Sequence, residues 1–66
     1  MITVNGEARS DVAPGTTLAC VVALLTQAPS GVAAAVNDAV VPRGAWVSYT
    51  LGDGDRVEVL TAVQGG

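Results

Sequence analysis

The residues best suited to direct chemistry are the last five, Ala62-Val63-Gln64-Gly65-Gly66. Gly65 and Gly66 have no side chains to bury, and glycine loses more backbone freedom on ordering than any other residue. We therefore expect a thin, extended and flexible end whose carboxylate meets no steric obstruction. Such an end fits a narrow slot in an enzyme that modifies it. The alternative is an ordinary frayed terminus.

The residue types elsewhere argue against chemistry by the domain itself. The sequence has 66 residues, which predicts one domain of modest stability, and contains one cysteine and no histidine. Cys20 alone cannot form an internal disulfide, and zinc sites and nucleophile–base pairs need further Cys or His residues. We expect no bound metal, no bound cofactor and no catalytic side chain.

Charge and hydropathy limit the partners. The net charge is −3, with three arginines and no lysine, which argues against nucleic-acid binding. The acidity either steers the domain towards a basic partner or simply aids solubility. The first residues do not resemble a signal peptide, and no apolar run reaches the ~20 residues that cross a bilayer. We expect a cytoplasmic protein that binds no membrane.

The elements that position the tail follow from local patterns. Asn5-Gly6 predicts a hairpin turn between strands at Met1–Asn5 and Glu7–Val12. Thr16 or Thr17 is expected to cap a helix that runs to about Gln27. Its apolar stripe has the spacing i, i+3, i+4, i+7 and consists of Leu18, Val21, Val22 and Leu25.

The second half predicts three more strands. Val32–Val36 is wholly apolar, which is typical of a central strand buried on both faces, and Asn37-Asp38 leads to a return strand at Ala39–Val41. A short irregular or helical segment follows, with Trp46 as its packing anchor. After an acidic turn, 56–62 is expected to be the last strand, with Val57 and Val59 facing inward. It can pair beside the first strand in the centre of the sheet.

The predicted architecture is α+β: a mixed sheet of about five strands with one main helix across one face. We expect residues 1–62 to form the domain and residues 63–66 to form a flexible tail. Fully extended, these four residues span at most roughly 13–14 Å.

A series of short motifs points to one family. In chain order they are Ile2-Thr3-Val4-Asn5-Gly6-Glu7, Val36-Asn37-Asp38, Val40-Val41-Pro42-Arg43 with Trp46, Leu51 with Gly52-Asp53-Gly54-Asp55-Arg56-Val57-Glu58-Val59, Thr61-Ala62-Val63, and Gly65-Gly66. Together they resemble the ThiS sulfur carriers of thiamin thiazole synthesis, which have the ubiquitin-like β-grasp fold. Gln64 stands where many of those proteins have another glycine.

The resemblance implies a function for the tail. An adenylyltransferase, an E1-like activating enzyme, would use ATP to adenylate the carboxylate of Gly66. A sulfur donor protein would then convert the adenylate to a thiocarboxylate, and thiazole synthase would receive the sulfur. Gly66 would be the reacting group and Gly65 would allow threading, so the protein would be a co-substrate rather than an enzyme.

Docking is expected to involve the sheet face away from the helix, as in the resembling family. Val63, Gln64, Leu60 and Ala62 are the candidate partner-binding residues. The sequence does not decide whether Leu60 is an exposed docking residue or part of the core. Arg56 and Glu58 are expected to form solvated cross-strand pairs.

Two other readings remain. Within sulfur transfer, the molybdopterin-synthase small subunit and carriers for cysteine synthesis or tRNA thiolation share the fold and the Gly-Gly end. Outside it, the domain would be a non-covalent β-grasp binding module whose terminal glycines are incidental.

Overall fold

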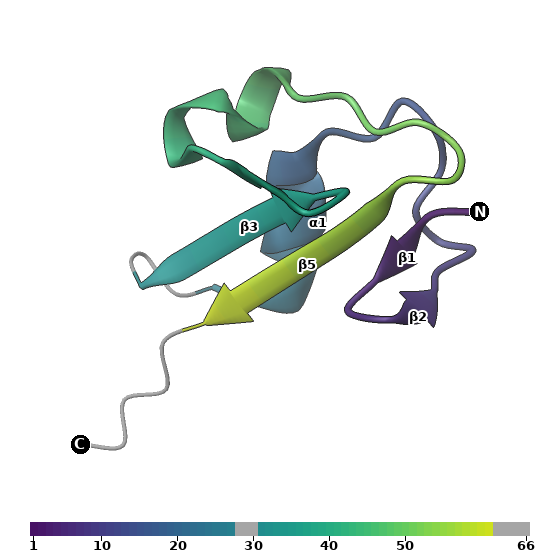
Figure 1. Ribbon diagram of the computed structural model, residues 1–66, viewed down its shortest axis with the longest axis horizontal. Helices are drawn as coiled ribbons and strands as arrows, with labels where there is room; N and C mark the ends of the chain where they lie inside the picture. The colour runs from purple at the N-terminus through teal and green to yellow at the C-terminus, as the bar shows by residue number, and fades with distance from the viewer. Residues whose placement is uncertain (28–30, 62–66) are drawn as a thin grey trace.

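A computed structural model of the chain describes residues 1–27 and 31–61. In chain order these form β1 (Thr3–Val4), β2 (Glu7–Ala8), α1 (Leu18–Leu25), β3 (Val32–Val36), β4 (Ala39–Val41), the 3-10 helix η1 (Arg43–Ser48) and β5 (Arg56–Thr61). The strands make one sheet in the order β2-β1-β5-β3-β4 (Figure 1). β5 runs parallel to β1, and the other neighbours are antiparallel. The expected position of the last strand, central and beside the first, is confirmed.

Two tight turns build the outer hairpins. Asn5 and Gly6 have φ of 52° and 84°, and Asn37 and Asp38 have φ of 51° and 71°. Two consecutive left-handed residues match the right-handed twist of the strands that they join, and asparagine, aspartate and glycine adopt this conformation most readily. Both turns lie where the sequence predicts them.

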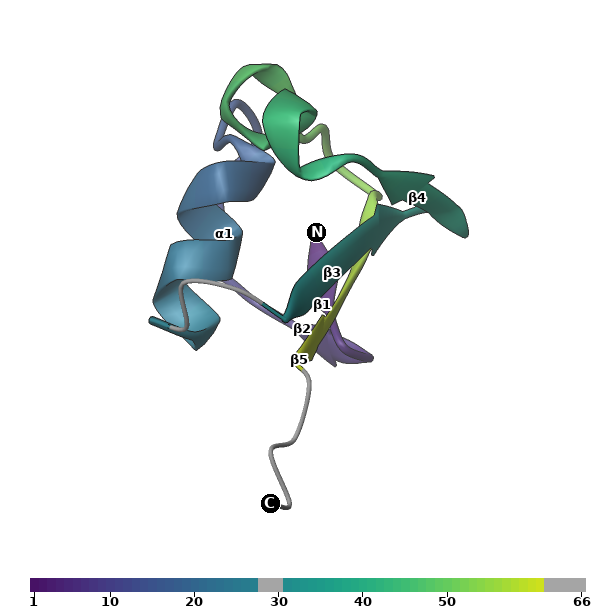
Figure 2. The same cartoon turned by 90° about the vertical axis from the view of Figure 1, so that its left-hand side faces the viewer.

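The core lies between the sheet and α1, which covers one sheet face (Figure 2). Ile2, Leu18, Val21, Val36 and Val57 are its largest fully buried side chains. Among the described residues, no polar or charged side chain is buried. The small domain therefore depends on close packing of light aliphatic groups.

The helix begins as predicted and ends earlier. The Thr17 hydroxyl accepts a hydrogen bond from the Cys20 N–H at 3.3 Å, which is the expected N-cap. Thr26 has extended backbone, with φ −153° and ψ 150°, so α1 stops at Leu25 rather than near Gln27. Leu25 is 38% exposed, whereas the other three residues of the predicted stripe are buried.

Two strand predictions are corrected by the structure. The second strand spans Glu7–Ala8 instead of 7–12, because the chain turns and Val12 donates its N–H to the Arg9 carbonyl at 3.3 Å. That turn brings the Val12 side chain into the core. β3 is not buried on both faces: Ala34 and Val36 are buried, while Ala33 is exposed. One helix covers only one face, and β3 lies between β5 and β4 rather than at the centre.

Trp46 is the predicted anchor of the segment after β4. Its side chain is 6% exposed, and its Nε1–H donates to the Val41 carbonyl at 2.8 Å. Farther along, the Leu18 N–H donates to the Tyr49 carbonyl at 2.8 Å, which ties the start of α1 to the segment after η1.

Two asparagine side chains fix the position of β5. Asn5 Oδ1 accepts from the Val59 N–H at 2.9 Å, on the β1 side. Asn37 Oδ1 accepts from the Arg56 N–H at 3.0 Å, at the end of β3. Each asparagine also donates its own backbone N–H to β5, at 2.8 Å to the Val57 and Arg56 carbonyls respectively. The turn residues thus extend the pairing of β5 beyond the ends of β1 and β3.

We expect Asn5→Gly to lower the free energy of unfolding by about 1 kcal/mol, because the left-handed backbone stays accessible while the acceptor for Val59 is lost. Asn5→Ala should cost roughly a further 1 kcal/mol, because alanine is strained at positive φ. Asn5→Asp, which keeps an acceptor, is the control. Urea unfolding measures all three, and a glycine variant as stable as the wild type would contradict this role.

The acid side of the stability curve should depend on Asp55. Its carboxylate accepts from the Gly52 N–H at 2.8 Å and from Asn37 Nδ2 at 3.0 Å, and these bonds hold the pKa of Asp55 below its ordinary 3.8. A carboxyl group whose pKa is lower in the folded than in the unfolded state stabilises the fold at pH values above its unfolded-state pKa. This stability is lost as the pH falls through the folded-state pKa. We expect Asp55→Ala to cost about 1 kcal/mol at neutral pH. In urea titrations the difference should shrink well below pH 3.8, and an unchanged difference would refute the assignment.

Candidate functional site

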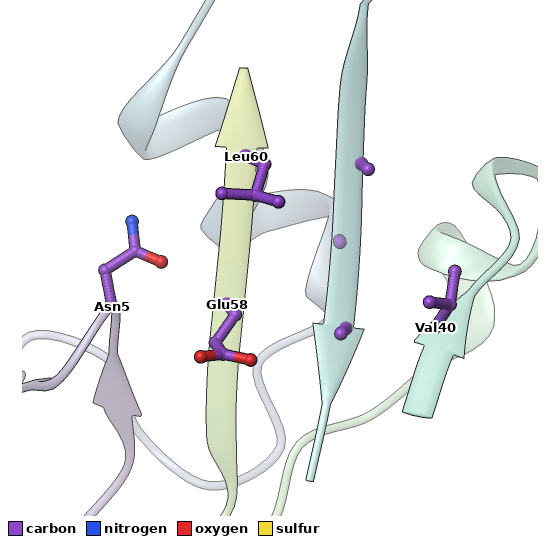
Figure 3. Close-up of a pocket in the computed structure, with 7 residues that line it drawn as sticks. Asn5, Val40, Glu58 and Leu60 are labelled. Carbon is purple, nitrogen blue, oxygen red and sulfur yellow. The ribbon is translucent and has the colours of Figure 1, made fainter. Parts of the chain in front are cut away.

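The sheet face opposite α1 presents exposed side chains of β5, the last strand that the structure describes. Register places Leu60 directly across from Ala33 and Glu58 across from Ala35, and Ala35 lies across from Val40. Since directly opposed residues share a face, these five side chains point away from the helix. We call this surface, formed by Ala33, Ala35, Val40, Glu58 and Leu60, the open face (Figure 3).

The open face is largely apolar although it meets solvent. Leu60 is 71% exposed and Val40 is 78% exposed. Figure 3 shows Leu60 and Glu58 along β5, with Asn5 to one side and Val40 to the other. The small alanines of β3 leave a depression of about 190 Å³ between the larger side chains. Small-molecule pockets usually measure roughly 300–1,000 Å³, so this depression suits a protruding side chain of a protein partner better than a ligand.

The structure shows whether Leu60 is exposed or part of the core, which the sequence left open. Val57 and Val59 are buried on the helix side, as predicted, and Leu60 has the opposite parity on β5. It is therefore an exposed docking candidate and not part of the core. Leu24 and Val47 are also exposed, but they lie on α1 and η1, not on the sheet.

The other predicted site residues, Ala62, Val63, Gln64, Gly65 and Gly66, lie outside the described residues, as does the predicted domain boundary after residue 62. Their connection to the site is covalent: the described part of the chain ends at Thr61, the last residue of β5. Leu60 is therefore two residues before Ala62 in sequence, so anything bound to the open face is close to the start of this segment.

Val40, Ala33 and Ala35 belong to the site but were not predicted from sequence. A signal was present: a two-residue turn at Asn37-Asp38 pairs Ala35 with Val40 and so places them on one face. The exposure of that face could not be read from the run Ala33-Ala34-Ala35, because its members do not differ in polarity.

Of the two charged residues of β5 that were predicted to form solvated cross-strand pairs, Arg56 does so and Glu58 does not, within the described residues. Arg56 Nη2 donates to Asp38 Oδ2 at 3.0 Å, which joins β5 to the β3–β4 turn. Both partners are well exposed, so the pair adds little to stability. Glu58 lies opposite Ala35, which offers it no charged partner.

The described residues offer no group of three or more His, Cys, Asp and Glu side chains that could hold a metal ion. Cys20 is exposed on α1, on the far side of the sheet from the open face. Within 1–27 and 31–61, no helix has the length and apolar character needed to span a membrane.

Comparison with known proteins gives a consistent result. A model of the ThiS family matches residues 2–66. The crystal structure of a thiamine biosynthesis protein (ThiS) from Geobacter metallireducens is similar, with 33% identity, a TM-score of 0.74, and coverage of 98% of this chain and 97% of that one. The solution structure of a thiamine biosynthesis protein from the same organism has 33% identity and a TM-score of 0.79, covering 98% and 86%.

A search of curated protein sequences gives no match. The family match and the two structures, together with the mixed five-stranded sheet, confirm the ubiquitin-like β-grasp fold predicted from the sequence.

Alanine substitutions at two adjacent residues of β5 test which of its faces points into the core. Val59→Ala should lower the free energy of unfolding by about 2 kcal/mol, since it removes two buried methyl groups and leaves a cavity. Leu60→Ala removes more carbon from an exposed site and should change stability by less than about 0.5 kcal/mol. Urea unfolding compares the two variants, and a reversed order would mean that β5 presents its other face to the core.

Proposed function

Because the chain belongs to the ThiS family, we propose that it is a sulfur carrier of thiamine biosynthesis whose own C-terminal carboxylate is the reacting group. The matched region extends to residue 66 and so includes the Gly65-Gly66 segment as well as the domain. Two similar solved structures are of thiamine biosynthesis proteins, which supports this pathway over the other sulfur-carrier pathways.

The chemistry takes place at the Gly66 carboxylate. A carboxylate resists nucleophiles because of its negative charge, so it must first be activated. An adenylyltransferase joins it to the AMP portion of ATP and releases pyrophosphate. The donor delivers hydrosulfide, whose sulfur attacks the acyl carbon as AMP leaves, and loss of the proton from sulfur gives the terminal thiocarboxylate that thiazole synthase receives. The carrier supplies the acyl group, and its partners supply ATP and the catalytic groups.

The domain contributes by docking. The observation that supports this most directly is the 71% exposure of Leu60, on the strand that leads into the tail. A partner that covers the open face fixes β5, and the four residues 63–66 then have a reach of at most roughly 13–14 Å. Holding two reacting groups together in this way replaces a bimolecular encounter with an effectively intramolecular one.

Intact-mass spectrometry tests the chemistry. The protein is incubated with ATP, a sulfur donor and the adenylyltransferase encoded in the same genome, hereafter the activating enzyme. The expected product is heavier by the difference between one sulfur and one oxygen atom, and fragmentation should locate the change at Gly66. The same mass in the presence and absence of ATP would refute the proposal. Restoration of thiamine-independent growth by a carrier with a blocked C-terminus would favour the non-covalent binding module.

Gly66→Ala should reduce the rate of adenylation by about 100-fold, because a Cβ beside the reacting carbonyl displaces it from the attack geometry. The matched control is Gly44→Ala on η1, where an added Cβ meets no atom within 4 Å. ATP–pyrophosphate exchange measures the rate. Equal rates for Gly66→Ala and wild type would contradict the need for a slender terminus.

A further inference from the structure

Glu58 differs from most other carboxylates of the described residues because no cation or hydrogen-bond donor contacts it. Asp11 pairs with Arg9 at 2.6 Å, Asp38 pairs with Arg56 at 3.0 Å, and Asp53 pairs with the N-terminal ammonium. Asp55 accepts hydrogen bonds from Gly52 and Asn37. Within the described part of the chain this leaves Glu58 on the open face and Glu7 on β2.

On the side of β3 and β4 the surroundings of Glu58 are apolar, and Asn5 lies on its other side. Ala35 lies directly opposite, Leu60 follows two residues later on the same face, and Val40 lies one strand farther across (Figure 3). Arg56 precedes Glu58 by two residues on that face, but its guanidinium donates to Asp38. The open face is therefore an apolar surface that carries one negative charge, on β5 beside Leu60.

A partner that covers the open face must compensate the negative charge of Glu58. Contact with Leu60 and with Ala35, the residues next to Glu58 on this face, removes water from its carboxylate, and a carboxylate that loses water without gaining a counter-charge opposes binding strongly. A second copy of this chain is a poor occupant. A symmetric pairing of two open faces would bring two Glu58 carboxylates into the same apolar contact.

We propose, on the basis of the proposed function, that the activating enzyme presents an arginine or lysine to Glu58 within an apolar surface that contacts Leu60 and Val40. The apolar contacts supply most of the buried area. The charge pair selects the partner, sets the register in which the two surfaces meet and accelerates the encounter. Docking in this register then delivers the tail that follows β5.

Binding of the purified activating enzyme, measured by calorimetry without ATP, tests the pair. Glu58→Gln should weaken binding by about 30-fold, the loss typical when one member of a desolvated charge pair is removed. Added salt should weaken binding of the wild type more steeply than binding of this variant. Glu7→Gln is the matched control: Glu7 is opposite Val4, which is buried on the helix side, so it lies on the other face of the sheet.

A charge exchange gives the sharpest result. Glu58→Lys should abolish measurable binding, and replacement of the responsible enzyme arginine or lysine by glutamate should restore it. Thermal unfolding of each Glu58 variant should match the wild type, because the side chain is exposed and forms no ion pair within the described residues.

The outcomes separate this inference from the proposed function. If Leu60→Ala weakens binding while Glu58→Gln binds like the wild type, the counter-charge is refuted and the docking face stands. If neither variant weakens binding and the thiocarboxylate still forms, docking on the open face is refuted and the carrier chemistry stands. If no thiocarboxylate forms with wild-type protein, the proposed function fails, whatever the binding data show.

Discussion

The register of β5 is the constraint on which the rest of the molecule depends. β5 lies between β1 and β3, and Asn5 and Asn37 hold it from the two sides with side-chain and backbone hydrogen bonds. Because side chains alternate along a strand, a shift by one residue would turn Val59 outward and Leu60 into the core. The same bonds that stabilise the sheet therefore determine which side chains of β5 belong to the open face.

The parts of the fold that the sequence predicts well are local. Asn5-Gly6 and Asn37-Asp38 are turns because few residues tolerate left-handed backbone, and the burial of Val57 and Val59 follows from alternation. The length of β2 and the exposure of β3 were mispredicted because they depend on distant parts of the chain. A single helix shields one sheet face, and nothing in an alanine run indicates which face that is.

The candidate site was predicted unevenly for a similar reason. Motif resemblance identified the family, which the match over residues 2–66 confirms, and it supplied the role proposed for Gly66. Leu60 was named, but its exposure required the structure. Glu58 was expected to form a solvated cross-strand pair, but the residue directly opposite it is Ala35, which carries no charge. Which residue lies opposite a given position depends on strand order and register, which residue spacing does not reveal.

The sheet order also has a consequence for folding during synthesis on the ribosome. β1–β2 and β3–β4 are separate hairpins that β5 joins, and β5 is the last of the five strands to be synthesised. An isolated two-stranded hairpin is only marginally stable in water, so neither hairpin is stable before β5 has been synthesised. The nascent chain should thus stay unfolded until residues 56–61 emerge and then fold in one step, so that the open face forms at the same moment as the core.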